Sequence, residues 1–182
     1  MARHDQPSSL VEGIFRREVL PWALLGFTLG LVEGATVAVL VKKGYAGAAT
    51  PTAVNFAVAL VSGAPALANI VSFAWANLVH GRARVGMLAS IQAAFALAVG
   101  CIALAPEGAG GLTVTILAVI VARMLWTGVL TVRATVWTAN YPRHVMARVT
   151  ARMVMVGSMG VALVALLAGW VLDRNAGHAR WL

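Results

Sequence analysis

The chain has 182 residues, of which 60% are hydrophobic and only 11% are charged, and its mean hydropathy is +0.85. Soluble domains average about half apolar and a quarter charged residues, so this composition excludes an ordinary soluble protein and predicts an integral membrane protein. The net charge of +8 comes largely from Lys and Arg in short connections between apolar runs. Basic residues in such places contact lipid headgroups, so we expect the lipid bilayer, and no nucleic acid, as a partner.

Five apolar runs that are long enough to cross a bilayer follow one another along the chain. They predict an all-α membrane bundle over residues 20–172, between a polar segment at 1–19 and a polar tail at 173–182. The expected spans are 20–41, 52–79, 85–105, 112–139 and 152–172. In the second span, "SGAPALAN" contains Pro65, which predicts a bend at that point.

The distribution of Lys and Arg predicts the orientation of these spans. Eight of these residues lie on the side of the N-terminus and four on the opposite side. By the positive-inside rule, we expect a multi-pass protein of the cell (inner) membrane with its N-terminus in the cytoplasm.

The first span contains "GFTLGLVEG", in which Gly26, Gly30 and Gly34 recur every four residues. Small residues at this spacing form a stripe that lets another helix approach closely, so we expect them to serve helix packing. Glu33 lies near the same face, roughly 12 Å from the outer end of its span. An acid at membrane depth is costly and is typical of a proton carrier, an ion ligand or the partner of a buried base.

The fourth span carries two arginines, Arg123 and Arg133. Arg123 lies roughly 16 Å into its apolar run, too deep to reach the headgroups easily, and we expect it to face a cavity or a partner in the interior. Arg133 is closer to the cytoplasmic end, and we expect it to extend to the headgroups. Because the depths of Glu33 and Arg123 agree within a helical turn, the two could pair if the first and fourth spans are neighbours.

Polar residues in two other spans are candidates for a substrate path. Asn55, Ser62 and Asn69 follow at seven-residue spacing in the second span, and Gln92 is isolated in the third. They either line the path or make hydrogen bonds between helices. With Glu33 and Arg123, we take Asn55, Asn69 and Gln92 as the predicted substrate and proton pathway.

The sequence contains none of the common catalytic or metal-binding patterns, and its acids do not pair at a spacing suited to acid–base or two-metal chemistry. The only cysteine, Cys101, falls inside an apolar run. We therefore expect neither an enzyme nor a bound metal or cofactor.

The fourth span and the connection after it, "ARMLWTGVLTVRATVWTANYPRHVMARVTARM", resemble the major facilitator superfamily. Members of that superfamily carry an arginine followed shortly by a glycine in helix four, here Arg123 and Gly128, and then "YP" with arginines. The corresponding cytoplasmic connection contains Arg143 and Arg148. Gly81 and Arg82 match the later part of the superfamily's signature loop, although Leu78 stands where its aspartate is expected.

This resemblance implies that helices one and four lie together around a central cavity and that Glu33 exchanges protons beside Arg123. It also implies two six-helix halves, so the chain corresponds to the N-terminal part of a carrier that another chain or another copy completes. We therefore expect a secondary transporter of a small solute or drug that works by alternating access, with proton coupling as one option. The alternative is a small non-transporting membrane protein that uses its glycine face for assembly with a partner.

Overall fold

The computed structural model describes residues 9–81 and 83–174, and over these residues the chain folds into helices joined by short connections. The helices are α1 (Ser9–Leu31), α2 (Gly34–Gly44), α3 (Pro51–Ile70), α4 (Ser72–Val79), α5 (Arg84–Ala103), α6 (Ala109–Asn140) and α7 (Arg143–Arg174).

Four of these helices, α3, α5, α6 and α7, are long and apolar enough to cross a membrane. Helices α1 and α2 together form a fifth candidate span, which is broken and bent by 43°. The predicted all-α class is thus confirmed over the described residues. Four or five helices are long and apolar enough to span a membrane where five spans were predicted, and the span boundaries differ from the predicted ones. The first span starts earlier, because α1 includes residues that the sequence assigned to a polar segment.

The second predicted span is also divided, but not at its proline. Pro65 lies inside the continuous helix α3, and the break falls at Val71. There the amide of Val71 donates to the carbonyl of Ala68 and the amide of Ala74 donates to that of Val71. These bonds span three residues instead of four, so the helix tightens for one turn and restarts as α4.

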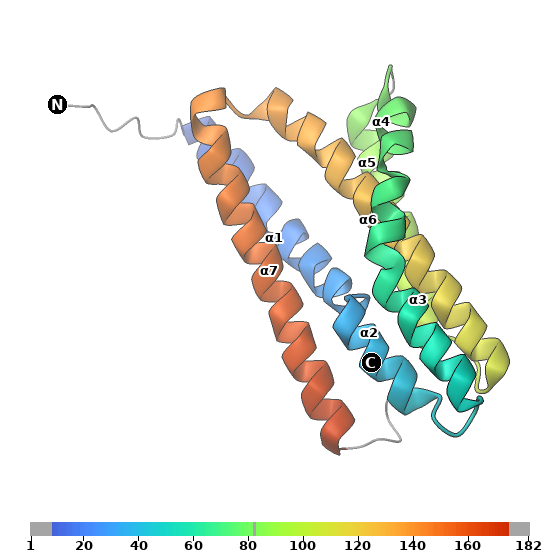
Figure 1. The fold of residues 1–182 in the computed structure, drawn as a ribbon. Helices are drawn as coiled ribbons and strands as arrows, with labels where there is room; N and C mark the ends of the chain where they lie inside the picture. The colour runs from blue at the N-terminus through green and yellow to red at the C-terminus, as the bar shows by residue number, and fades with distance from the viewer. Residues whose placement is uncertain (1–8, 82, 175–182) are drawn as a thin grey trace.

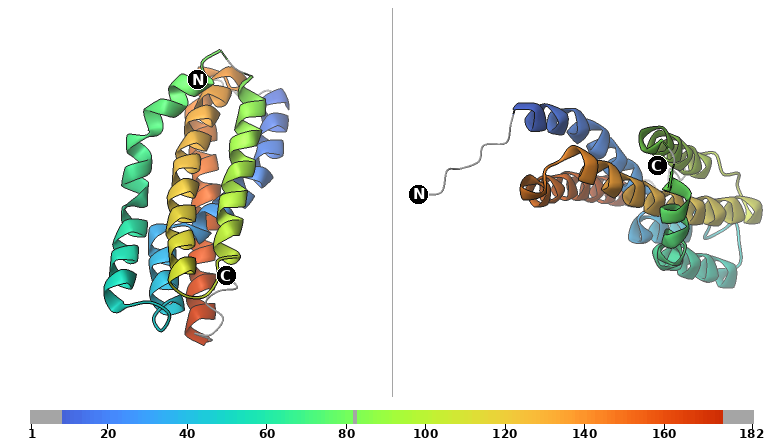
Figure 2. Two further views of the ribbon diagram at one scale, coloured as in Figure 1. Left: turned by 90° about the vertical axis from the view of Figure 1, so that its right-hand side faces the viewer. Right: turned by 90° about the horizontal axis from the view of Figure 1, so that it is seen from above.

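The helices form two groups (Figure 1). Helices α1 and α7 lie side by side along most of their lengths, and α6 packs against α5, α3 and α4. The short helix α2 connects the groups through its contact with α3 (Figures 1 and 2). The start of α1 and the α4–α5 and α6–α7 connections lie at one end of the bundle, and the α2–α3 and α5–α6 connections lie at the opposite end.

Glycines bring α1 and α7 into backbone contact. A Cβ added at Gly26 would lie 2.6 Å from the carbonyl oxygen of Gly157, and one added at Gly30 would lie 2.7 Å from the Cβ of Val164. Gly34 has only an ordinary contact, 3.8 Å from the Cα of Ser62. Two of the three predicted packing glycines are therefore buried against α7 of the same chain.

We expect Gly26→Ala to destabilise the bundle by about 1–3 kcal/mol, because the added methyl group would meet backbone that cannot move aside. The matched control is Gly100→Ala on α5, where an added Cβ meets nothing within 4 Å. That control should be neutral or stabilising, since alanine favours a helix by about 1 kcal/mol over glycine. Thermal unfolding in detergent, followed by circular dichroism, compares the two; equal melting temperatures would contradict the packing.

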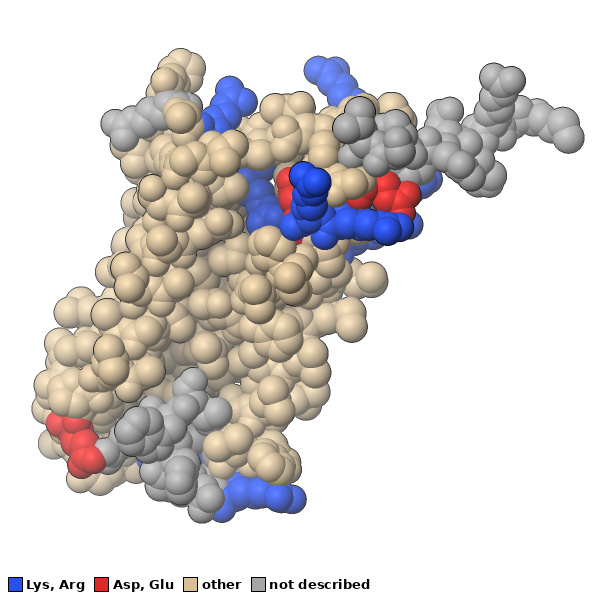
Figure 3. All heavy atoms as spheres, turned by 180° about the vertical axis from the view of Figure 1, so that it is seen from behind, with Lys and Arg blue, Asp and Glu red and all other residues tan. Residues whose placement is uncertain are grey.

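Charged side chains gather at the two ends of the molecule on the face drawn in Figure 3, with a wide apolar belt between them. Exposed large hydrophobic side chains are most numerous on α7 and also occur on α1, α3 and α6. Such a belt is suited to the hydrocarbon core of a bilayer, because apolar surface there meets lipid instead of water.

Candidate functional site

The break in the first span places Glu33 between two helices. The amide of Val32 donates to the carbonyl of Leu29 at 3.0 Å, which closes α1 with a tight turn. Glu33 then adopts an extended conformation, with φ −67° and ψ 136°, and its carbonyl accepts from the amide of Val37 to start α2. Its side chain does not cap α2. The carboxylate is therefore free to turn towards α6.

Glu33 and Arg123 form an ion pair across the two helix groups. Arg123 Nη2 lies 2.8 Å from Glu33 Oε1. The Arg123 side chain is 7% exposed, and its Nε atom has no hydrogen-bond partner among the described residues. A buried guanidinium needs a nearby negative charge, because the interior solvates it poorly. The Glu33 carboxylate supplies that charge.

The other side of the carboxylate faces an open cleft of about 400 Å³ between α1, α6 and α7. The Glu33 side chain is 40% exposed, so it is accessible from the cleft while Arg123 is buried behind it. Apolar and small side chains make up most of the remaining wall. The lining residues are Trp22, Gly26, Leu29, Glu33, Trp126, Leu130, Val154, Gly157, Ser158, Val161 and Ala162.

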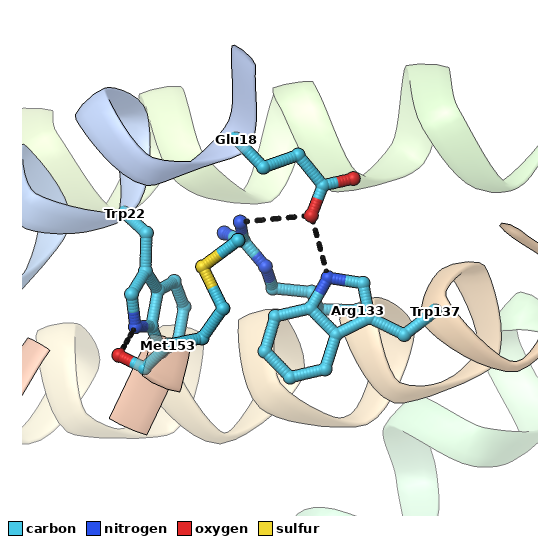
Figure 4. Close-up of polar contacts among 5 residues, drawn as sticks. All are labelled: Glu18, Trp22, Arg133, Trp137 and Met153. Carbon is cyan, nitrogen blue, oxygen red and sulfur yellow. Dashed lines mark hydrogen bonds and ion pairs between the residues drawn. The ribbon is translucent and has the colours of Figure 1, made fainter. Parts of the chain in front are cut away.

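A second acid–arginine pair lies nearer the end of the bundle where α1 begins (Figure 4). Arg133 Nη2 of α6 lies 3.7 Å from Glu18 Oε2 of α1, and the same oxygen accepts a hydrogen bond of 2.8 Å from Trp137 Nε1. The Arg133 guanidinium also lies over the ring of Trp22, with its central carbon 4.2 Å from the ring centroid. A cation over an indole face is attracted by the electrons of the ring.

Trp22 connects three helices around this pair. Its Nε1 donates to the backbone carbonyl of Met153 on α7 (Figure 4). Its ring stacks on that of Trp126 at 5.6 Å between centroids and meets the ring of Trp137 edge-on at 5.8 Å. Trp126 in turn contacts Phe95 of α5. These four side chains, Trp22, Phe95, Trp126 and Trp137, form an aromatic layer above the Glu33 site.

The prediction for Arg133 was wrong: its side chain is only 6% exposed and does not extend to the surface. The sequence reading also missed Glu18, because this residue lies among polar residues assigned to the segment outside the membrane. The spacing of acidic, basic and aromatic residues nevertheless indicated this contact. Glu18 and Trp22 are four residues apart, as are Arg133 and Trp137, so each pair lies on one face of its helix.

The remaining predicted pathway residues do not join Glu33. Asn55 and Asn69 are exposed on α3, whose buried face consists of Val54, Ala57, Val61, Ala64 and Ala68. Gln92 is half-buried on α5 and does not line the cleft. The face of α3 that carries Asn55 and Asn69 therefore points away from the described bundle.

The predicted loop residues lie at the end of the bundle where α1 begins. Gly81 has a φ of +74° in the α4–α5 connection, a conformation that favours glycine, whereas Arg82 lies outside the described residues. Arg143 is the first residue of α7. The assignment of Arg148 to a connection was wrong, because α7 begins nine residues before the predicted fifth span and includes it.

Within the described part of the chain, no three His, Cys, Asp or Glu side chains come together as they would around a metal ion. No family model, no curated protein and no solved structure matches the chain.

Proposed function

We propose that the chain is part of a secondary transporter that moves a small organic cation across the cell membrane and couples this movement to protonation of Glu33. The observation that carries the proposal is the Glu33–Arg123 pair at the broken first span, with its carboxylate facing the cleft. A carboxylate beside the Trp22 and Trp126 rings suits a ligand with a positive charge and an apolar body.

In this mechanism Glu33 alternates between its ion pair and a bound proton. A proton on the carboxylate removes its attraction to Arg123 and also its attraction to a cationic ligand, so proton and ligand compete for one group. Loss of the ion pair would weaken the contact between α6 and the α1–α2 break. Protonation would then shift the equilibrium between two arrangements of the helix groups, as alternating access requires.

The helix contacts support a carrier built from inverted three-helix repeats, as the resemblance to the major facilitator superfamily implies. Such a repeat relates the first span to the fourth and the second to the fifth. If span one contacts span five, the repeat therefore predicts a matching contact between span four and span two. The chain contains both contacts, α1 with α7 and α6 with α3.

We place the N-terminus in the cytoplasm and a second chain, or a second copy, opposite the open side of the cleft. Asn55 and Asn69 support a second chain or copy that packs against α3, because exposed amides on a spanning helix are costly in lipid and favourable when they meet another helix. The alternative function, assembly through the glycine face, has less support. Gly26 and Gly30 already pack against α7 of their own chain.

Proteoliposomes with an imposed pH gradient test the transport proposal, with ethidium as the fluorescent organic cation. We expect Glu33→Gln to abolish gradient-driven ethidium accumulation, because the amide cannot bind and release a proton at this position. Glu107→Gln, in the α5–α6 connection outside the cleft, is the matched control and should accumulate ethidium like the parent protein. Full accumulation by Glu33→Gln would refute the proposal, and no accumulation by the parent protein would refute the version in which a second copy completes the carrier.

A further inference from the structure

A second groove, separate from the Glu33 cleft, lies between the first turns of α1 and α7. It has a volume of about 340 Å³, and its rim carries Arg16 of α1 with Arg148 and Arg152 of α7. All three arginines are exposed. Between them the wall is apolar: Phe15 is half-buried, and Val145 and Val149 are buried. The groove therefore combines a cationic rim with an apolar floor.

Its positive charge is only partly balanced by the described residues that line it. Glu12 also lines the groove, and its Oε1 lies 3.0 Å from Arg16 Nη2. Arg152 extends over the Phe15 ring, with 5.9 Å between its central carbon and the ring centroid. Three arginines and one glutamate leave a net charge of +2 on the rim. An occupant with one or two negative charges would complement that rim.

The position of the groove indicates what occupies it. The apolar candidate spans start at Glu12 and at Arg143, so the groove lies where the helices enter the bilayer. Lys, Arg, Asp and Glu side chains gather at this end of the molecule, beside the apolar belt (Figure 3). Lipid phosphates lie at this level of a bilayer, with acyl chains directly below them.

We propose that this groove binds the phosphate headgroup of an anionic phospholipid, with Arg148 and Arg152 on the phosphate and an acyl chain along Phe15, Val145 and Val149. A phospholipid is favoured over a soluble phosphate because the soluble ion has no apolar part to cover the floor. Guanidinium groups suit the role, since they hold phosphate oxygens through paired hydrogen bonds.

Native mass spectrometry of the full chain in detergent tests the site with dioleoyl phosphatidylglycerol and dioleoyl phosphatidylcholine as competing lipids. We expect the parent protein to retain phosphatidylglycerol in preference, and the double variant Arg148→Gln/Arg152→Gln to lose that preference by about tenfold or more. The control is the double variant Arg84→Gln/Arg143→Gln. It also removes two positive charges, at the first residues of α5 and α7, and neither residue lines the groove. It should keep the preference within about twofold.

Three results would overturn the proposal. The first is a parent protein that shows no preference for phosphatidylglycerol. The second is an equal loss in the two double variants, which would mean that general charge attracts the lipid. The third is full displacement of the lipid by millimolar inorganic phosphate, which would identify a site for a soluble anion. Circular dichroism spectra and melting temperatures show whether each double variant has folded. If Arg148→Gln/Arg152→Gln does not fold, the single variant Arg148→Gln takes its place.

Discussion

Replacing Glu18 by alanine is expected to lower the free energy of unfolding by about 3 kcal/mol. The variant leaves Arg133, 6% exposed, without the only acid that the structure pairs with it among the described residues. It also removes the acceptor of the Trp137 indole N–H. A buried cation and a partly buried donor would both lose their partner.

The exposed pair on the same helix is the control for this effect. Glu12 and Arg16 form an ion pair of 3.0 Å, but their side chains are 53% and 77% exposed, so Glu12→Ala should cost no more than about 0.5 kcal/mol. Unfolding by sodium dodecyl sulfate in mixed micelles measures both variants. The double variant Glu18→Leu/Arg133→Met should recover most of the loss, because it leaves no buried charge. If the double variant lost as much unfolding free energy as the two single variants together, the pairing of Glu18 with Arg133 would be contradicted.

The number and type of spans were predictable because a membrane helix needs about twenty apolar residues, and the sequence displays these runs plainly. Helix starts were less predictable. Helix α1 begins at Ser9 because polar residues such as Arg16 and Arg17 are compatible with a helix that extends beyond the hydrocarbon core. The break at Glu33 carries no proline, so no residue in the sequence marks it.

The candidate site was partly predictable for a similar reason. Depth can be estimated from position in a span, and the matching depths of Glu33 and Arg123 pointed to the ion pair that the structure contains. Which helices are neighbours cannot be read in this way. Asn55 and Asn69 share one face of α3, but that face points outward, and nothing in their spacing indicates the direction.

The role of the aromatic layer could not be predicted from residue type alone. Trp22 and Trp126 are large apolar residues in apolar runs, and alone they are typical of a core or of a membrane interface. Their significance lies in their contacts with Arg133, Glu18 and the backbone of Met153, which join three helices. Searching for charged and aromatic residues four apart would have found Glu18 with Trp22 and Arg133 with Trp137 before the fold was known.

Proton release on ligand binding tests the central claim most directly. In weakly buffered detergent solution with a pH-indicator dye, we expect ethidium binding to release protons at a pH low enough for Glu33 to be protonated, because there the cation displaces the proton from Glu33. Glu33→Gln should release none, and Glu107→Gln should behave like the parent protein. Equal proton release by Glu33→Gln and the parent protein would contradict the claim that Glu33 is the group shared by proton and ligand.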